Sequence, residues 1–200
     1  DKVDLVQARI DYRASKEWEG NRLSVRGAVV GSPGNLTGRN DDADFEAFRP
    51  GASSSYLYAT VGADWQRRLP GDWSLRVAAE GQLSSGALLA IEQLGLGGYD
   101  TVRGYDERIY LADSGYAFST EIRTPPIRLP DDVPGHPVVQ FLGYLDHATG
   151  WRNFGNDESF SGVGFGSRAR IGDGELRLDI GWPLRKGDGA GVHAGFNKSF

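Results

Sequence analysis

The sequence contains neither cysteine nor methionine among its 200 residues. Without cysteine, the chain has no disulfide, no thiolate nucleophile and no cysteine-based zinc site. No apolar run approaches the ~20 residues that a membrane-spanning helix needs. Helix signals are scarce as well, because 29 residues are glycine, which favours turns, bulges and close strand contacts over helix interiors. The scarcity of helix signals and the many glycines indicate a chain built mainly of strands and turns.

Basic residues are also in the minority, with 22 Lys and Arg against 27 Asp and Glu and a formal net charge of −5. No basic run is interleaved with aromatics, so we expect no nucleic-acid partner. The histidines His136, His147 and His193 do not form an H-x-x-x-H pair, and neither a G-x-S-x-G elbow nor a P-loop is present. The stretch "GVGFGS" (162–167) departs from G-x-G-x-x-G at its last position. We therefore predict that the protein is not an enzyme and has no catalytic residue, metal or cofactor.

The chain does not begin with methionine and shows no signal peptide, so we expect a processed product or an excerpt of a longer chain. Its mean hydropathy of −0.42 is that of a water-soluble protein. Low mean hydropathy is equally compatible with a transmembrane β-barrel, whose strands alternate between lipid-facing and lumen-facing residues.

Apolar residues recur at every second position over much of the chain, which is the period of a β-strand. In one segment Leu176, Leu178 and Ile180 alternate with Glu175 and Arg177. Ten such segments are predicted: 5–15, 22–31, 55–68, 72–84, 86–96, 116–124, 138–148, 160–171, 174–184 and 191–200. Several have ten or more residues, the length that a tilted strand needs to cross a bilayer.

Two architectures fit this alternation. One is a soluble antiparallel sheet with one face in water. The other is a transmembrane β-barrel whose polar face lines a lumen, where charged pairs such as Glu80 with Arg76 and Glu121 with Arg123 meet water or each other. The strand length favours the second, so we predict an all-β, antiparallel transmembrane β-barrel with about ten strands in this chain.

The segments 31–53 and 97–115 are long enough to be loops rather than tight turns. If the chain ends on the periplasmic side, the second of them lies on the extracellular side. The acidic run "NDDADFE" (40–46) has carboxylates two apart, as a calcium loop would, but lacks the turn glycine and the distal glutamate. We therefore predict a solvated acidic loop there.

The stretch "GGYDTVRGYDERIYLADSGYAFSTEIRTPP" (97–126) carries a lone Arg103 beside Gly104 in the middle of a predicted loop. A glycine pair precedes it, an acidic-x-Gly step follows it, and S-x-E-x-R-x-P closes it. This ordered set resembles the two-partner secretion transporters of the haemolysin-activator type (ShlB/FhaC/HecB) in the BamA/TpsB superfamily. Residues 67–98 also look more like this branch than like the barrel-assembly branch.

The resemblance implies roles for particular residues. Val102, Arg103, Gly104 and Tyr105 match a V-R-G-[FY] motif at the tip of a plug loop (97–115) that folds back into the lumen. The loop hinge is Gly97, Gly98, Asp113 and Gly115. "GYLDHATGW" (143–151) resembles the F/G-x-D-x-G strand motif, which makes Asp146 the first salt-bridge partner of Arg103 and Glu121 the second. Phe196 and Phe200 resemble the C-terminal signature recognised during membrane insertion, although Lys198 departs from it.

The family barrel has sixteen strands, preceded by periplasmic substrate-binding domains. This chain supplies neither those domains nor all the strands, so the resemblance implies that residues 1–200 are the C-terminal part of the barrel in the bacterial outer membrane. The implied function is translocation of an unfolded exoprotein through the lumen. The implied partners are that exoprotein, the lipid bilayer and the barrel assembly machinery. Two alternatives remain open: an insertase of the same superfamily, and a barrel fragment that has no activity alone.

Overall fold

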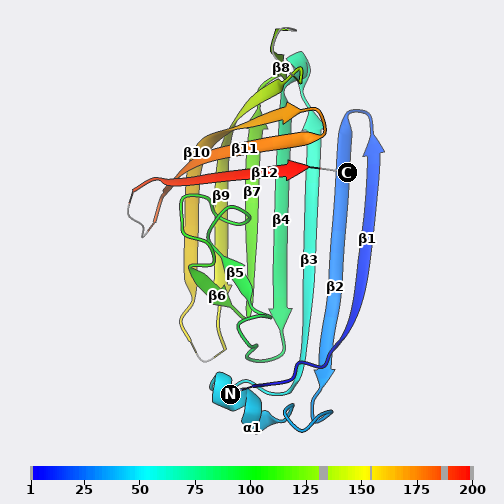
Figure 1. Cartoon of the computed structure of the whole chain (residues 1–200), viewed down its shortest axis with the longest axis vertical. Helices are drawn as coiled ribbons and strands as arrows, with labels where there is room; N and C mark the ends of the chain where they lie inside the picture. The colour runs from blue at the N-terminus through cyan, green and yellow to red at the C-terminus, as the bar shows by residue number, and fades with distance from the viewer. Residues whose placement is uncertain (1, 131–134, 154, 186–188, 199–200) are drawn as a thin grey trace.

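The computed structural model describes residues 2–130, 135–153, 155–185 and 189–198. The chain forms one antiparallel ten-stranded sheet that curves around a small two-stranded sheet (Figure 1). The strands are β1 (Ala8–Trp18), β2 (Asn21–Pro33), β3 (Ser55–Arg68), β4 (Ser74–Ser84), β5 (Leu94–Leu96), β6 (Tyr110–Ala112), β7 (Ser114–Arg123), β8 (Ile127–Arg128), β9 (Val138–Trp151), β10 (Glu158–Ile171), β11 (Gly174–Pro183) and β12 (Gly191–Lys198). The predicted all-β antiparallel fold is confirmed.

The large sheet is ordered β1-β2-β3-β4-β7-β9-β10-β11-β12, and the short β8 pairs with β9. Consecutive long strands are neighbours throughout, and residues 85–113 between β4 and β7 leave the sheet and return to the adjacent position. In the described residues, β1 and β12 are the two edges and do not pair with each other. Figure 1 shows β10, β11 and β12 bending across the face on which β5 and β6 lie, so that face is concave.

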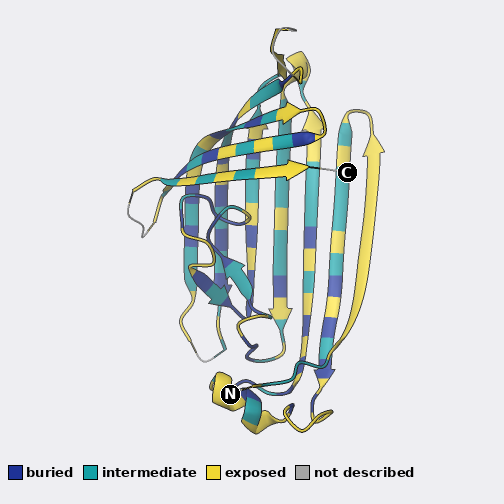
Figure 2. Ribbon diagram, in the orientation of Figure 1, coloured by how far each residue is buried: buried dark blue, intermediate teal, exposed yellow. Residues whose placement is uncertain are grey.

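Side-chain burial follows the two-residue period of the sequence (Figure 2). On β3, Leu57 and Val61 are 54% and 65% exposed, whereas Tyr56 and Tyr58 on the other face are buried. Residues two positions apart on a strand point to the same face of the sheet. The exposed apolar residues of successive strands therefore share one face, the convex face. They include Val29, Leu57, Val61, Phe118, Ile122, Phe141, Leu145, Phe165, Leu176, Leu178 and Phe196.

One predicted strand is wrong. Only Leu94–Leu96 of the segment 86–96 is a strand, and it pairs with β6 in the small sheet rather than with the wall. Leu88 and Leu89 are buried in a cluster with Phe45 and the inward-facing Tyr56. These two leucines are therefore apolar because they pack in this cluster, and not because they belong to a wall strand. Five long strands, β7 and β9 to β12, follow the central loop as expected.

The acidic run 40–46, predicted to be a solvated loop, instead begins a helix, α1 (Asp42–Phe48), within the long segment 31–53. Asp41 begins it with a capping box, in which its carboxylate accepts from the backbone N–H of Asp44 at 2.9 Å and the Asp44 carboxylate accepts in return. Asp42 accepts hydrogen bonds from Ser53 and from the backbone and side chain of Ser54, and these bonds lower the pKa of Asp42. The acidic residues whose spacing resembles a calcium loop thus cap a helix and bind it to the chain that follows.

The two ends of the sheet differ. At one end, called the turn end, short turns join β1 to β2, β3 to β4 and β10 to β11. At the other, called the loop end, lie the α1 segment, residues 85–113 and the β9–β10 connection. Within the described residues there is no helix whose length and apolar character would suit a membrane span.

Candidate functional site

The segment between β5 and β6 forms a compact loop on the concave face (Figure 1). It begins with Gly97 and Gly98, whose φ angles of 96° and 91° lie in the left-handed region that glycine adopts without strain. A Cβ on Gly97 would stand 2.6 Å from the carbonyl oxygen of Asp106, so the turn also needs a residue without a side chain. The pair that the sequence marked as a hinge is a tightly packed turn in this structure.

Arg103 lies at the tip of this loop and is only 4% exposed. Its Nε donates to Oδ2 of Asp146 at 2.7 Å and its Nη2 donates to Oδ1 at 2.8 Å. Its Nη1 donates to Oε1 of Glu121 at 2.8 Å, and Nη2 also donates to the hydroxyl of Ser119 at 2.9 Å. The structure therefore brings the loop arginine together with both carboxylates named from the sequence, one on β9 and one on β7.

The backbone takes part in the same contact, since the N–H of Arg103 donates to Oδ2 of Asp146 at 3.1 Å. The guanidinium also lies 3.5 Å from the ring centroid of Tyr144, on the same face of β9. A cation placed over an aromatic ring and paired in bidentate fashion with a carboxylate favours arginine, because a lysine ammonium offers neither planar geometry nor a fork of donors. The loop tip is thus held in one orientation.

A second layer of charges surrounds this pair. Asp179 on β11 is fully buried, 3.5 Å from Nη1 of Arg103, and accepts from Arg168 on β10 at 3.0 Å. Glu121 also accepts from Nη2 of Arg123, which lies 2.5 Å from its Oε2, and its Oε1 lies 3.6 Å from Nη1 of Arg76 on β4. Each buried carboxylate therefore faces at least one arginine, which offsets the cost of removing these charges from water.

Glycines in the wall leave room for the loop tip. Gly104 has a φ of 99°, and a Cβ on it would lie 3.0 Å from the backbone of Gly181 on β11. A Cβ on Gly162 of β10 would meet the carbonyl oxygen of Arg103 at 2.2 Å, and one on Gly191 of β12 would meet the Gly104 Cα at 2.9 Å. Three successive strands thus carry glycine where the loop backbone touches them. This explains Gly162 of β10, whereas a Cβ on Gly164 would meet the Tyr144 hydroxyl and one on Gly166 the Asp179 carboxylate.

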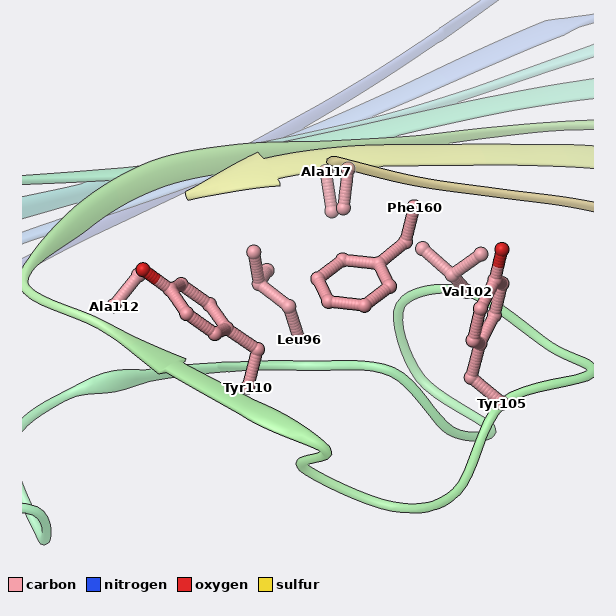
Figure 3. Close-up of a cluster of buried hydrophobic side chains, with 8 residues drawn as sticks. Leu96, Val102, Tyr105, Tyr110, Ala112, Ala117 and Phe160 are labelled. Carbon is pink, nitrogen blue, oxygen red and sulfur yellow. The ribbon is translucent and has the colours of Figure 1, made fainter. Parts of the chain in front are cut away.

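Apolar contacts bury the rest of the motif. Val102 is fully buried, and Tyr105 packs edge-on against Phe160 of β10 with ring centroids 5.2 Å apart (Figure 3). The hydroxyl of Tyr105 donates to the carbonyl oxygen of Ser161 at 3.1 Å and contacts the backbone carbonyl of Arg185 beyond β11. All four residues of the motif are therefore packed against the inner wall.

The two residues that follow the loop lie at the loop end of the sheet. Asp113 is fully buried, just before β7, and binds Arg49 from the α1 segment. Gly115 is in β7, where a Cβ would meet the carbonyl oxygen of Thr149 at 2.7 Å. Of the two C-terminal aromatics, Phe196 is 67% exposed on the convex face of β12, and Phe200 lies outside the described residues.

Several residues of the site are absent from the sequence prediction. Tyr144 is part of the quoted strand motif but was assigned no contact. Arg168 and Asp179 show only the alternation of their strands, and Arg49 is separated from Asp113 by 64 positions. In a single sequence, only the charge of these inward residues marks them, since charged side chains on a mostly buried face need partners.

An antiparallel sheet with an apolar convex face, curved around a loop that a buried arginine fastens to its concave face, has the features of part of a β-barrel. The chain is a member of the haemolysin secretion/activation protein family ShlB/FhaC/HecB, whose family model matches residues 7–169. That match covers the sheet from β1 into β10, including the loop, Arg103 and both of its acidic partners.

Among solved structures, the chain is similar to CdiB from Escherichia coli, with a TM-score of 0.76 at 18% sequence identity. The similarity covers 96% of this chain and 36% of the CdiB chain, so the sequence spans about a third of that protein's length. At this identity the likeness establishes the fold. No curated protein matches the chain.

Proposed function

We propose that residues 1–200 form the C-terminal part of an outer-membrane β-barrel that translocates an unfolded exoprotein through its lumen, as in two-partner secretion. Membership of the secretion/activation family supports this assignment. The observation that carries it is the buried pairing of Arg103 with Asp146 and Glu121, which holds a loop on the concave face of the sheet. In a closed barrel that face lines the lumen, and the loop occupies the path of the exoprotein.

The position in the membrane follows from the two faces of the sheet. The convex face carries the exposed apolar residues, and the concave face carries charged side chains such as Arg26, Asp64, Arg76 and Glu80 around an open cavity of about 670 Å³. Apolar side chains facing outward and polar side chains facing inward are the pattern of an outer-membrane barrel. We place the loop end outside the cell and the turn end in the periplasm.

The remaining partners belong to the same proposal. The missing strands would pair with the free edges of β1 and β12 to complete a sixteen-stranded barrel, and periplasmic domains that recognise the exoprotein would precede it. The assembly machinery of the outer membrane would insert it. The family resemblance would make Gly97, Gly98, Asp113 and Gly115 the points at which the loop pivots, with the first two in its tight turn and the last two at the start of β7.

Secretion of the partner exoprotein by the complete transporter tests this function. Arg103→Ala should reduce secretion strongly while the amount of folded barrel, measured by heat-modifiable migration on gels, stays near normal. Arg103→Lys should restore little, because lysine replaces neither the bidentate contact nor the stacking on Tyr144. Arg170→Ala is the matched control, since Arg170 is an arginine of the same wall with a 71% exposed side chain. Normal secretion by Arg103→Ala would contradict the assigned role of the loop.

A further inference from the structure

The concave face is not polar along its whole length. At the loop end of the sheet, Val30 on β2 and Tyr56 and Tyr58 on β3 point inward and are buried. Their cover comes from segments outside the wall: Phe45 from α1, Leu88 with Leu89 from the connection after β4, and the partly buried Val3 and Leu5 from the residues before β1. Figure 1 shows α1 beyond the strand ends at this end of the sheet. These side chains therefore cover the inner apolar surface at the loop end of the sheet.

Residues 34–54, here called the cap segment, are joined to the wall by Arg49. Arg49 follows α1 directly, and its guanidinium binds both carboxylate oxygens of Asp113, with Nη2 donating to Oδ2 at 2.7 Å. The same guanidinium donates to the carbonyl oxygen of Leu88. One side chain thus ties the cap segment to the start of β7 and to residues 85–93.

The carboxylate of Asp113 also binds other segments at the loop end of the sheet. It accepts from the backbone N–H of Leu88 at 2.9 Å, from Gln93 at 3.1 Å and from the backbone N–H of Asn153 at 2.8 Å. Four separate stretches of chain therefore meet at one buried carboxylate: the cap segment, residues 85–93, the start of β7 and the β9–β10 connection. In the described residues, the other ion pair of the cap segment, Arg39 with Asp4, is largely exposed.

We propose that the cap segment and residues 85–93 form an exit gate at the loop end of the barrel, and that the Arg49–Asp113 pair is its latch. This inference rests on the proposed function, because the gate matters only if a polypeptide leaves by this mouth. An emerging extended chain must part the cap segment from residues 85–93, which both contribute to the cover of Val30, Tyr56 and Tyr58. The latch keeps them together when no exoprotein is in transit, since a buried bidentate pair holds one geometry.

The absence of cysteine from these 200 residues allows a direct test of the closed state. Thr60 lies on β3 and lines the open cavity on the concave face. Thr60→Cys, placed in the complete transporter with no other accessible cysteine, reports access from outside when intact cells are treated with a maleimide too large for general porins. Labelling should be slow in this parent and at least about tenfold faster with Arg49→Ala, because charge-assisted bidentate bonds are among the stronger ones.

Two further variants define the effect. Arg39→Ala, which removes an exposed arginine from the same cap segment, should label at the parent rate. Asp113→Asn keeps the size of the side chain but loses its charge, and should label as fast as Arg49→Ala or faster. Equal labelling of the parent, Arg49→Ala and Asp113→Asn would overturn the latch. Because this assay needs no exoprotein, it decides the latch even if the proposed secretion function fails.

A second experiment asks whether the gate must open during secretion. Ala52 in the cap segment and Ala87 in the facing segment form an isolated β-bridge and are both buried. Bridge partners lie within the Cα range that a disulfide spans, so Ala52→Cys with Ala87→Cys should form one. The oxidised double variant should fail to secrete the exoprotein, reduction should restore secretion, and either single variant should secrete normally. Normal secretion with the disulfide closed would overturn the gate.

Discussion

The guanidinium of Arg103 and the carboxylate of Asp146 meet at two points, Nε to Oδ2 at 2.7 Å and Nη2 to Oδ1 at 2.8 Å, although 43 positions separate them in the chain. Both side chains are almost fully buried, at 4% and 1% exposure. The contact joins the tip of a long loop to the middle of a wall strand. It fixes the loop and the register of β7 and β9 at once, because Glu121 on β7 accepts from the same guanidinium.

A double-mutant cycle should show this coupling. Arg103→Ala and Asp146→Ala should each lower the free energy of unfolding by about 3 kcal/mol, because each leaves a buried charge without its main partner. The double variant should lose less than the sum, with a coupling energy of at least about 1 kcal/mol. Denaturant unfolding of the refolded barrel in lipid measures all four proteins. Strict additivity would mean that the two residues do not interact.

The wall glycines should be as important as the charges for seating the loop. Gly162→Val places side-chain atoms where the carbonyl oxygen of Arg103 now lies, 2.2 Å from an ideal Cβ, and should cost roughly 1–3 kcal/mol through overpacking. The displaced loop should become a trypsin substrate at Arg103 and Arg108. Gly195→Val on β12 is the control, since a Cβ there meets nothing within 4 Å. Equal trypsin resistance in both variants would show that the loop does not need this glycine.

The outward face should tolerate apolar substitutions and reject charge. Leu178 is 44% exposed on the convex face of β11. Leu178→Arg should destabilise the protein folded in bilayers by roughly 2–4 kcal/mol, the cost of an arginine on the lipid face near the midplane. Leu178→Phe should fold nearly as well as the parent. An arginine variant that folds into bilayers as stably as the parent would place this face in water.

Acid should weaken the attachment of the cap segment. Burial by itself raises the pKa of Asp113, but the hydrogen bonds from Arg49 and from the N–H groups of Leu88 and Asn153 outweigh it and leave the pKa below its usual 3.8. A carboxyl with a lowered folded-state pKa stabilises the structure above its unfolded value and loses this contribution as the pH falls through the folded value. The protection of residues 41–54 against hydrogen exchange, measured relative to the intrinsic exchange rate at each pH, should therefore fall in the parent as the pH is lowered below about 4.

The matched variant for that experiment is Asp113→Asn, which has no carboxyl to titrate. Its protection should be low at every pH and should keep only the acid dependence that comes from Asp42, whose pKa is also lowered. If the parent and Asp113→Asn show the same acid dependence, Asp113 does not hold the cap segment.

Strand positions could be predicted wherever side-chain alternation continues to the strand ends. The segment 55–68 coincides with β3, and 174–184 differs from β11 by one residue. The segment 86–96 was misassigned because Leu88 and Leu89 are apolar for a different reason, their burial under α1. The helix was missed because its carboxylates were interpreted as loop residues, although Asp41 and Asp44 have the spacing of a capping box.

The residues of the site likewise fall into those that the sequence could predict and those that it could not. Arg103, Glu121 and Asp146 could be named from a resemblance of ordered motifs, and the structure brings them together. Arg49 carries no local signal, since its partner Asp113 is 64 residues away and only the packing of the β2–β3 and β4–β7 connections against each other brings the two together. Pairings that depend on the return of distant segments to one mouth are set by tertiary packing and cannot be read from side-chain alternation.

The central claim is that the concave face of this sheet is the path of an exoprotein. The direct measurement is site-specific photocrosslinking in the complete transporter with an exoprotein arrested in transit. Thr60 and Val61 are adjacent on β3 and point to opposite faces, inward to the cavity and outward with 65% exposure. A crosslinker at Thr60 should capture the exoprotein and one at Val61 should capture only lipid. Capture of the exoprotein from Val61, or from the β12 edge alone, would contradict passage through the lumen.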